Sequence, residues 1–497
     1  MMSPPADPFA TVTNSATLAG RSARGAAITL ATQFIKLGIT LLSTTILARL
    51  LTPRDYGVVG MAATLTTFVA IFKELGLSSA TIQRQKLGVG EVSTLLWVNA
   101  TLGLCLTGLT IALAPLVARF FADDRLTSVT ASLALTFLLQ GFTIQNDALL
   151  RRQMRFTALA ITELASLMAG FGVAALLAWR GAGYWALVLS NVAMALVSLG
   201  GVWIACPWRP QRPRLSDEVR EMLKFGGHLT GFSTINYFAR NADNVLIGRV
   251  WGADQLGLYS RAYQLLMLPI NQLTAPLSTV VLPLLSRLTD QPQLYRSTFL
   301  RLVEKLALVT MPGMMCLMLT ADWLIHLLMG PRWVDAGPVF AWLGLAGLFQ
   351  PVASATGWLF ISQGRTRDMF HWGILGGSLT VVSIAIGVPW GALGVARSYA
   401  VGGLLLFPVL VRFVTKVGPV EQAGFYRTLL LPSVATIIVA LLVLLLRMLV
   451  PTDAAFTGFG CALVATVSGT LLPLTLLPAG RTALQDTLSL IRLARTS

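Results

Sequence analysis

The sequence predicts an all-α polytopic membrane protein with about fourteen transmembrane helices, arranged as two six-helix lobes and two C-terminal helices. Of its 497 residues, 55% are hydrophobic and only 12% are charged. A soluble domain carries roughly 25% charged residues, and the mean hydropathy here is +0.72. Apolar runs that can cross ~30 Å of hydrocarbon recur along the whole chain. The first half of the chain also repeats weakly in the second.

The apolar runs predict the transmembrane helices in order. Each run has the length that an α-helix needs to cross a bilayer, and the segments between the runs are short. No soluble domain is therefore expected on either side. The predicted spans are 26–48, 56–78, 93–118, 127–147, 157–179, 183–206, 225–248, 257–286, 299–321, 335–361, 370–389, 392–414, 426–449 and 456–478.

Two aligned blocks define the internal repeat. One alignment pairs ILARLLTPRDYGVVGMA with LIGRVWGADQLGLYSRA and places Gly57 on Gly257. The other pairs LLQGFTIQNDALL with LFQPVASATGWLF and places Gln140 on Gln350. Because each half contains an even number of spans, both halves cross the membrane in the same sense. The repeat is therefore predicted to be parallel, with its pseudo-two-fold axis along the membrane normal.

The spans and the segments between them divide the chain into six predicted parts. A linker rich in Pro and Arg separates the lobes, and a short amphipathic helix is expected from Ser216. The last two spans contain few polar residues and are interpreted as a lipid-facing appendix. The parts are a cytoplasmic N-terminal tail (1–25), an N-lobe (26–206), a cytoplasmic linker (207–224), a C-lobe (225–414), the appendix (415–480) and a cytoplasmic C-terminal tail (481–497).

The net charge of +16 reflects membrane topology. With the N-terminus inside, 25 of the 37 Lys and Arg residues fall in inner segments and 8 in outer loops. This asymmetry follows the positive-inside rule and predicts that both termini are cytoplasmic. A nucleic-acid partner is therefore not expected, although the sequence pI is near 10.4.

Metal and cofactor sites are not predicted. The four cysteines stand singly among apolar neighbours, as small buried hydrophobic residues do. The three histidines share no ligand spacing with a cysteine or a carboxylate. These residues are Cys105, Cys206, Cys316, Cys461, His228, His326 and His371. The N-terminus also lacks the pattern of a cleavable secretory signal.

Polar side chains within the predicted spans mark a candidate cavity. Each ionisable group inside a span costs roughly 2.5–3.5 kcal/mol on insertion scales, so each is a functional hypothesis. The seventh span carries a polar stripe at helical spacing, and the first span carries polar residues at the equivalent repeat positions. The paired positions are Gln33 with Ser233, Lys36 with Asn236, Thr40 with Arg240 and Ser43 with Asp243. We therefore predict a polar cavity between the halves.

Several of these charges have a structural alternative. Arg240 and Asp243 are spaced i, i+3 and can neutralise one another instead of binding a ligand. Arg261 can either face the cavity or extend to the membrane interface. For Glu163, an interhelical salt bridge is the favoured role. For Lys36, which has no acid nearby in sequence, a role in the cavity is favoured.

The charges within the spans favour an anionic ligand. Because bases outnumber acids, the cavity is expected to attract an anionic headgroup, and arginine binds phosphate oxygens in a bidentate manner. Lys73 and Glu74 lie near the inner membrane face and are interpreted as interfacial anchors. The in-span bases are Lys36, Arg240, Arg261 and Arg397, and the acids are Glu163 and Asp243.

Several segments resemble bacterial polysaccharide flippases. These proteins are oligosaccharide–lipid exporters of the multidrug/oligosaccharidyl-lipid/polysaccharide superfamily. The resemblance runs from about residue 25 to the twelfth span. It is carried by LARLLTPRDYGVVGMA, ELGLSSATIQRQ, GAGYWALVLSN, NADNVLIGRVWGADQLGLYSRAYQL and GALGVARSYA. It implies two six-helix lobes that form a V around a central cationic cavity with inward- and outward-facing states.

The resemblance also implies a substrate and site residues. The substrate would be an undecaprenyl-diphosphate-linked oligosaccharide, moved by alternating access across the bacterial inner membrane for lipopolysaccharide, capsule or exopolysaccharide synthesis. Expected partners are the polysaccharide polymerase and glycosyltransferases of the same pathway, and membrane lipid. Cavity residues for the headgroup would be Lys36, Arg240, Arg261, Asn236 and Gln33. Asp243 and Glu163 would be candidates for coupling to a proton or sodium ion.

Two other functions compete with this interpretation. A multidrug or small-molecule cation-coupled antiporter of the same fold would require acids in the cavity, whereas this cavity is predicted to be basic. A membrane-embedded glycosyltransferase or polymerase would carry a large outer loop or an acidic motif at an outer helix end. The outer loops here are short and their acids are scattered. We therefore expect a transporter and no enzyme activity.

Overall fold

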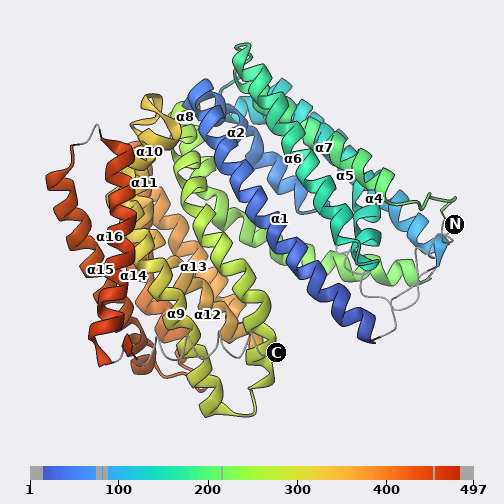
Figure 1. Ribbon diagram of the computed structural model, residues 1–497. Coiled ribbons are helices and arrows are strands. Elements are labelled where there is room, and N and C mark those ends of the chain that lie inside the picture. Colours follow the sequence, from blue (N-terminus) through green and yellow to red (C-terminus); the bar gives the residue numbers. More distant parts are fainter. Residues whose placement is uncertain are drawn as a thin grey trace. The chain divides into compact units, whose positions relative to one another are not determined.

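The computed structural model describes two compact units, unit 1 (Met1–Gly257) and unit 2 (Leu258–Ser497). The described residues are almost entirely helical and contain no strand (Figure 1). The positions that the structure describes are 15–73, 81, 88–213, 217–451, 454–478 and 480–481. Within these, the side chains of residues 15–24, 26, 217–236 and 238–240 are not described.

The described helices have the length and hydropathy of membrane spans. Eleven segments in the described parts are long and apolar enough to cross a bilayer. Each of the fourteen predicted spans overlaps a described helix. The number of crossings nevertheless stays a prediction, because the segment Thr366–Thr415 alone contains two of the predicted spans. The chain is a multi-pass membrane protein.

Unit 1 is built from helices that pack mainly as sequence neighbours. The α4–α5 and α6–α7 pairs form the largest contacts, and α1 lies along α6 (Figure 1). A capping box at Thr52 and Asp55 starts α2 and satisfies backbone donors that the first turn would otherwise leave free. The helices are α1 (Ser15–Leu50), α2 (Pro53–Ala70), α4 (Val89–Phe121), α5 (Arg125–Arg152), α6 (Phe156–Trp179), α7 (Tyr184–Ala205) and the first part of α8 (Asp217–Arg287).

Helix α8 joins segments that the sequence analysis separated. The amphipathic helix expected from Ser216 is the start of α8 and runs directly into the seventh predicted span. The loop expected between the seventh and eighth spans is replaced by a single break at Gly252, where φ is 79° and ψ is −169°. Glycine adopts a positive φ without the steric penalty of a side chain. One residue therefore redirects the chain where a loop was predicted.

The two glycines that the repeat superimposes lie in one close helix crossing inside unit 1. A Cβ atom on Gly57 would stand 1.7 Å from the carbonyl oxygen of Ala253. A Cβ atom on Gly257 would stand 1.8 Å from the carbonyl oxygen of Pro53. The contact is thus reciprocal, because the repeat also places Pro53 on Ala253. Such symmetry is what two segments related by a two-fold axis produce when they pack on each other.

Unit 2 contains the second part of α8 and eight further α-helices among its described residues. α9 packs against α15, and α13 packs against α14. The helices are α9 (Pro292–Leu319), α10 (Ala321–Met329), α11 (Ala336–Gly347), α12 (Gln350–Ser362), α13 (Thr366–Gly387), α14 (Gly391–Thr415), α15 (Gln422–Leu449) and α16 (Ala455–Leu476).

The predicted tenth span, 335–361, is two helices in the structure. α11 ends at Gly347 and α12 begins at Gln350, with Pro351 in its first turn. Proline has no N–H group and cannot continue the hydrogen-bond ladder of the preceding helix. In membrane proteins, discontinuous helices of this kind often line binding sites. Gln350, the first residue of α12, stands directly after this break.

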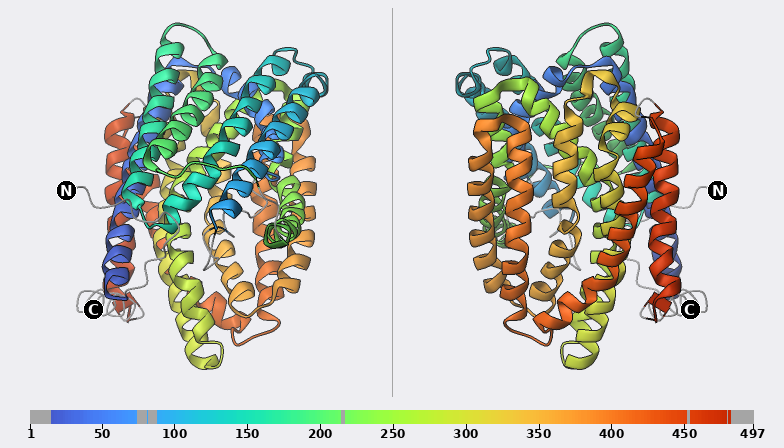
Figure 2. Two further views of the ribbon diagram at one scale, coloured as in Figure 1. Left: turned by 90° about the vertical axis from the view of Figure 1, so that its right-hand side faces the viewer. Right: turned by 90° about the vertical axis from the view of Figure 1, so that its left-hand side faces the viewer.

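Helices α15 and α16 stand side by side at one face of unit 2 (Figures 1 and 2). They were interpreted from the sequence as a lipid-facing appendix. The outer face of α15 is apolar and exposed, as at Leu441 and Leu445, but its inner face enters the core at Phe425 and Leu429. Arg447 on α15 also donates to the carboxylate of Asp322, with Nη2 and Oδ2 2.7 Å apart. α15 is therefore an integral part of unit 2.

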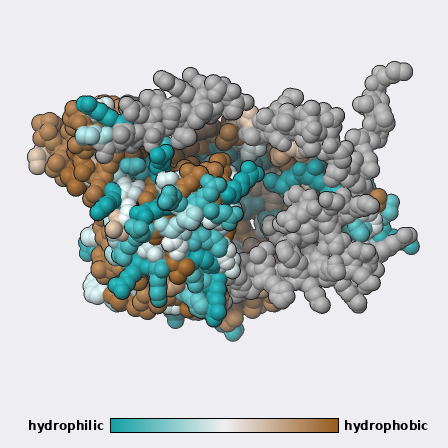
Figure 3. Space-filling model, turned by 90° about the horizontal axis from the view of Figure 1, so that it is seen from below, coloured by the Kyte–Doolittle hydropathy of each residue, from teal (hydrophilic) through white to brown (hydrophobic). Residues whose placement is uncertain are grey.

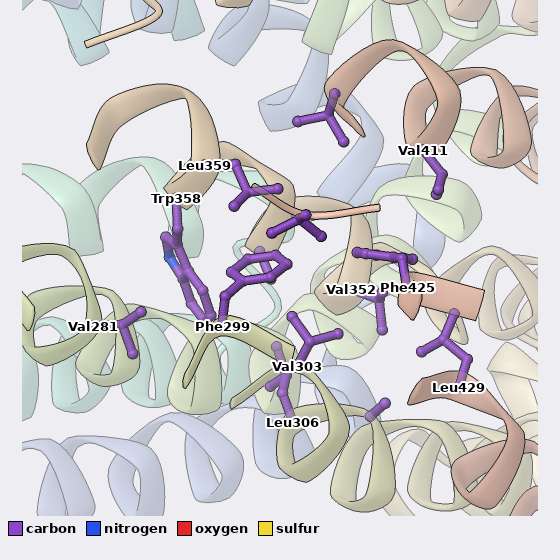
Figure 4. Packing of buried hydrophobic residues seen from close by; sticks show 14 of the residues in the cluster. Val281, Phe299, Val303, Leu306, Val352, Trp358, Leu359, Val411, Phe425 and Leu429 are labelled. Atoms are coloured by element: carbon purple, nitrogen blue, oxygen red, sulfur yellow. The ribbon is translucent and has the colours of Figure 1, made fainter. Parts of the chain in front are cut away.

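The main core of unit 2 gathers side chains from α8, α9, α12, α14 and α15 (Figure 4). Phe299 lies in its middle between Trp358 and Phe425, and the ring centroids of Phe299 and Phe425 are 6.3 Å apart. Hydrophilic residues cover the end of unit 2 at which α8 turns into α9, whereas hydrophobic residues cover its flank (Figure 3). Packing of side chains, rather than exclusion of water, stabilises such a core in lipid.

The change Phe299→Leu is expected to lower the free energy of unfolding by about 1–2 kcal/mol, because it leaves a small void in a fully buried position. Thermal unfolding of the purified protein in mild detergent measures the effect. Leu294→Ala is the control, since Leu294 lies on the same helix and is 48% exposed. Equal unfolding temperatures for the two variants would contradict the central place of Phe299.

Candidate functional site

The predicted cavity residues have different surroundings. Gln33 is exposed on α1, and Lys36 lies one turn further along the same helix. The Lys36 ammonium donates to the carboxylate of Glu163 on α6. Asn236 and Arg240 lie on α8, but their side chains are outside the description. Cavity contacts of these two residues therefore stay predictions.

The Lys36–Glu163 contact is an interhelical ion pair. It joins residues far apart in sequence, and the side chains are 25% and 47% exposed, respectively. The salt bridge expected for Glu163 is therefore present, and its partner is the lysine that had been placed in the cavity. Inside membrane spans, such a pair offsets part of the cost that each charge would carry alone. Both charges remain accessible to a ligand or an ion.

Asp243 and Arg261 lie on the two sides of the break in α8. Asp243 is only 5% exposed, and its Oδ1 accepts the backbone N–H of Asn244 at 2.8 Å. Arg261 is half-buried, and its Nη1 donates to Oε1 of Gln264 at 2.6 Å. This contact holds the Arg261 guanidinium against its own helix.

A polar hollow lies inside unit 1, among α2, α5, α6 and α7. Its volume is about 440 Å³, which is within the usual range of ligand pockets. Eight of the fourteen residues that line it carry a hydroxyl or an amide, and no Asp or Glu is among the described residues that line it. We call this cavity the unit 1 hollow. It is lined by Thr66, Thr67, Ala70, Lys73, Leu133, Thr136, Phe137, Gln140, Thr143, Ser166, Asn191, Met194, Ala195 and Ser198.

Lys73 supplies the positive charge of the unit 1 hollow. Its Nζ donates to Oε1 of Gln140 at 2.7 Å. The hydroxyls of Thr143 and Ser166 donate to backbone carbonyls of their own helices. Their oxygen lone pairs can still accept hydrogen bonds. The hollow therefore combines one ammonium donor with several acceptors, a combination suited to a phosphate that carries hydroxylated groups.

The ion pair and the hollow share helix α6. Glu163 and Ser166 are three residues apart, so they lie on the same face of that helix. The hydroxyl of Ser166 donates to the backbone oxygen of Glu163 at 2.9 Å. Lys36 and Glu163 therefore stand one helical turn from the wall of the hollow.

The unit 1 hollow was not predicted from the sequence. Lys73 was interpreted as an interfacial anchor because it lies near the inner membrane face, and in the structure its ammonium donates to Gln140. The repeat, which places Gln140 on Gln350, was the sequence feature that could have pointed to this hollow. Among the described residues, no group of three or more His, Cys, Asp or Glu side chains is arranged to hold a metal ion.

The sequence matches one described family. A family model with the description "Polysaccharide biosynthesis protein" matches residues 46–338, which is more than half of the chain. The chain is also similar to curated proteins of bacterial surface polysaccharide pathways. The teichuronic acid biosynthesis protein TuaB of Bacillus subtilis (strain 168) is 27% identical over 75% of this chain and 77% of its own length. The lipopolysaccharide biosynthesis protein WzxC of Escherichia coli (strain K12) is 24% identical, over 80% and 81%.

The fold is similar to that of a solved transporter. The lipid II flippase MurJ in an inward closed conformation superimposes with a TM-score of 0.72. The match covers 89% of this chain and 96% of MurJ, at 15% sequence identity. At this level of identity the likeness shows a shared fold only. It agrees with the predicted all-α polytopic architecture.

Proposed function

The chain belongs to the polysaccharide biosynthesis protein family, and from this premise we propose that it moves a lipid-linked oligosaccharide across a membrane. The substrate class is an oligosaccharide joined to undecaprenyl diphosphate. The product serves lipopolysaccharide, capsule or exopolysaccharide synthesis. This proposal rests on family membership together with a polytopic helical fold shared with a lipid flippase.

The observation that carries the proposal is the polar wall of the unit 1 hollow. Polar groups inside a membrane protein are expensive, and they usually mark a substrate or ion pathway. Here an ammonium, two amides and several hydroxyls converge on one hollow among apolar helices. A diphosphate headgroup with attached sugars offers both the anionic oxygens and the hydroxyl donors that this wall can bind. A simple apolar compound would leave these groups unpaired.

The headgroup contacts are proposed to include residues outside the hollow. Lys36, Arg240 and Arg261 would supply positive charge, and Asn236 and Gln33 would supply hydrogen bonds. Together they would line a cationic pathway that opens alternately to the two sides of the membrane.

The ion pair offers a route to coupling. A proton or sodium ion that binds the Glu163 carboxylate competes with the Lys36 ammonium for it. Lys36 is then released to bind a phosphate oxygen. Asp243 is the second candidate for ion binding, because it is a buried acid on α8.

The proposed cellular setting follows from the function. We place the protein in the bacterial inner membrane with both termini in the cytoplasm, as the distribution of Lys and Arg indicates. Its proposed partners are the glycosyltransferases that build the lipid-linked sugar and the polymerase that uses it.

The change Lys36→Ala is expected to lower transport of undecaprenyl-diphosphate-linked oligosaccharide about tenfold, as loss of one charged hydrogen bond predicts. Radiolabelled substrate in proteoliposomes measures the rate, with and without a proton or sodium gradient. Glu163→Gln is expected to remove the dependence on the gradient, because the amide neither binds a proton near neutral pH nor pairs strongly with Lys36.

Arg296→Gln is the control for these variants. Arg296 also forms a partly exposed ion pair, with Glu421, but it lies in unit 2 and does not line the unit 1 hollow. Its transport rate should equal that of the wild type. A wild-type protein that moves no lipid-linked sugar would refute the proposed function. Normal transport by Lys36→Ala and Glu163→Gln would refute only the assigned site.

A further inference from the structure

Unit 2 contains a second hollow, among α11, α12, α13 and α14. Its volume is about 190 Å³. In the register that places Gln140 on Gln350, it occupies the same place in the repeat as the unit 1 hollow. Wall positions correspond directly, because Ser166 falls on Gly376 and Met194 on Leu404. We call it the unit 2 hollow and define it by Phe349, Gln350, Trp372, Thr380, Ser383 and Gly403.

The equivalent glutamines of the two hollows differ in how they are satisfied. In unit 1, Oε1 of Gln140 accepts a hydrogen bond from Lys73. In unit 2, Oε1 of Gln350 is fully buried and has no hydrogen-bond partner among the described residues. Its amide nitrogen reaches only the sulfur of Met267, at 3.7 Å. An unsatisfied buried acceptor costs about 1–3 kcal/mol, so its persistence calls for a donor from elsewhere.

The wall of the unit 2 hollow excludes charged ligands. No Lys, Arg, His, Asp or Glu is among the described residues that line it. An anionic headgroup would find no counter-charge there, and a cation would find no carboxylate. A prenyl chain would leave the Gln350 carbonyl unpaired. The ligand is therefore neutral and carries at least one hydrogen-bond donor.

Aromatic side chains give the hollow flat apolar surfaces. The rings of Phe349 and Phe407 are tilted by 41° to one another, with their centroids 5.0 Å apart. The indole of Trp372 lies along its own helix above Gly376, where a Cβ would approach it to 3.1 Å. Flat aromatic faces bind flat apolar patches well. The C–H groups on one face of a sugar ring form such a patch, while its hydroxyls point outward.

Glycine residues leave space in the wall of the hollow. A Cβ on Gly403 would meet no atom within 4 Å, so this glycine faces free space. Drug-sized ligands usually occupy pockets of ~300–1,000 Å³. The unit 2 hollow, at about 190 Å³, has room for a single ring.

We propose that the unit 2 hollow binds one neutral sugar ring of the transported oligosaccharide, an inference that rests on the proposed function. The terminal torsion of glutamine is broad, so the Gln350 amide can turn its Oε1 into the hollow, where one ring hydroxyl donates to it. Other hydroxyls donate to the oxygens of Thr380 and Ser383, whose own protons are given to backbone carbonyls. The apolar face of the ring packs on Trp372. The repeat has thus produced one hollow for a charged group and one for an uncharged ring.

Binding of simple glycosides to the purified protein tests this inference. Methyl glycosides of glucose, galactose and N-acetylglucosamine are titrated in a sugar-free detergent, and binding is followed by saturation-transfer NMR and by tryptophan fluorescence. At least one glycoside should bind saturably. Mannitol, which has similar hydroxyls but no ring, should not.

Three variants locate the binding. Gly403→Leu fills the hollow and should weaken glycoside binding and transport of the lipid-linked oligosaccharide at least about tenfold. Gln350→Leu should also abolish binding but should not lower the unfolding temperature, because it removes an unsatisfied group. Gly373→Leu is the matched control, since Gly373 also faces free space on α13 but does not line the hollow.

The outcomes separate this inference from the proposed function. Loss of binding and transport in Gly403→Leu, with both retained in Gly373→Leu and both variants folded, supports the sugar site. Absence of saturable glycoside binding, or wild-type transport by Gly403→Leu, overturns it while the proposed function stands. If the wild type transports nothing, the proposed function fails, and glycoside binding alone then decides whether the hollow takes a sugar ring.

Discussion

Replacing Gly57 by alanine is expected to prevent recovery of stably folded protein. The new Cβ would stand 1.7 Å from a backbone oxygen of α8, and backbone cannot move aside as a flexible side chain can. Overpacking of ordinary cores costs about 1–3 kcal/mol, and a clash between two backbones exceeds that range. Gly257→Ala should have the same effect, because the contact is reciprocal. The yield of monodisperse protein and its unfolding temperature in detergent measure both.

Gly60→Ala provides the control for this prediction. Gly60 lies one turn from Gly57 on the same face of α2, and its Cβ would meet Leu256 at 3.5 Å, an ordinary contact. Alanine favours a helix over glycine by about 1 kcal/mol, so Gly60→Ala should be as stable as the wild type or more so. If Gly57→Ala behaves in the same way, α2 and α8 do not cross as closely as described.

Replacing Lys73 by methionine is expected to reduce transport of the lipid-linked oligosaccharide about 10- to 100-fold. Methionine keeps much of the apolar stem but removes the ammonium that binds Gln140 and, in the proposed function, the phosphate. A hydrogen bond to a charged group contributes about 1.5–3 kcal/mol, which corresponds to this range of rates. Transport in proteoliposomes measures the loss.

A double-mutant cycle with Gln140→Leu tests the pairing of Lys73 with Gln140. If the two side chains act together, the double variant should transport no worse than Lys73→Met alone. Lys305→Met is the control, because Lys305 is half-buried in unit 2 and lines neither hollow. Fully additive losses would show that Lys73 and Gln140 act independently.

The helical architecture could be predicted from the sequence with good accuracy. Inside lipid every backbone polar group must be satisfied within its own segment, so long apolar runs can only be helices. Two details differ where one residue altered the backbone, although Ala336–Ser362 is still one segment long and apolar enough to cross a bilayer. Gly252 replaced a predicted loop by a break in α8, and Pro351 divided a predicted span into α11 and α12. Hydropathy reports how apolar a segment is, but it does not distinguish a loop from a backbone break at one residue.

The candidate site was predicted less completely. Polarity inside a span marked Lys36 and Glu163 as important, but not that they face each other across α1 and α6. Lys73 was interpreted as an interfacial anchor from its place near the inner membrane face, and its contact with Gln140 was not predicted. Partners distant in sequence depend on the rotation and tilt of each helix, and these are set by packing contacts such as those of the glycines.

By itself the sequence determined that this chain is a multi-pass helical membrane protein, and it predicted a parallel repeat of its halves. The amino-acid composition and the recurrence of long apolar runs suffice to identify the membrane protein, because the bilayer permits so few backbone structures. Only the tertiary structure showed which contacts the repeated residues make. It showed that Gly57 and Gly257 meet in one crossing and that Gln140 and Gln350 line two unlike hollows. The difference between the hollows comes from which side chains packing brings to each glutamine, and a linear pattern does not contain that information.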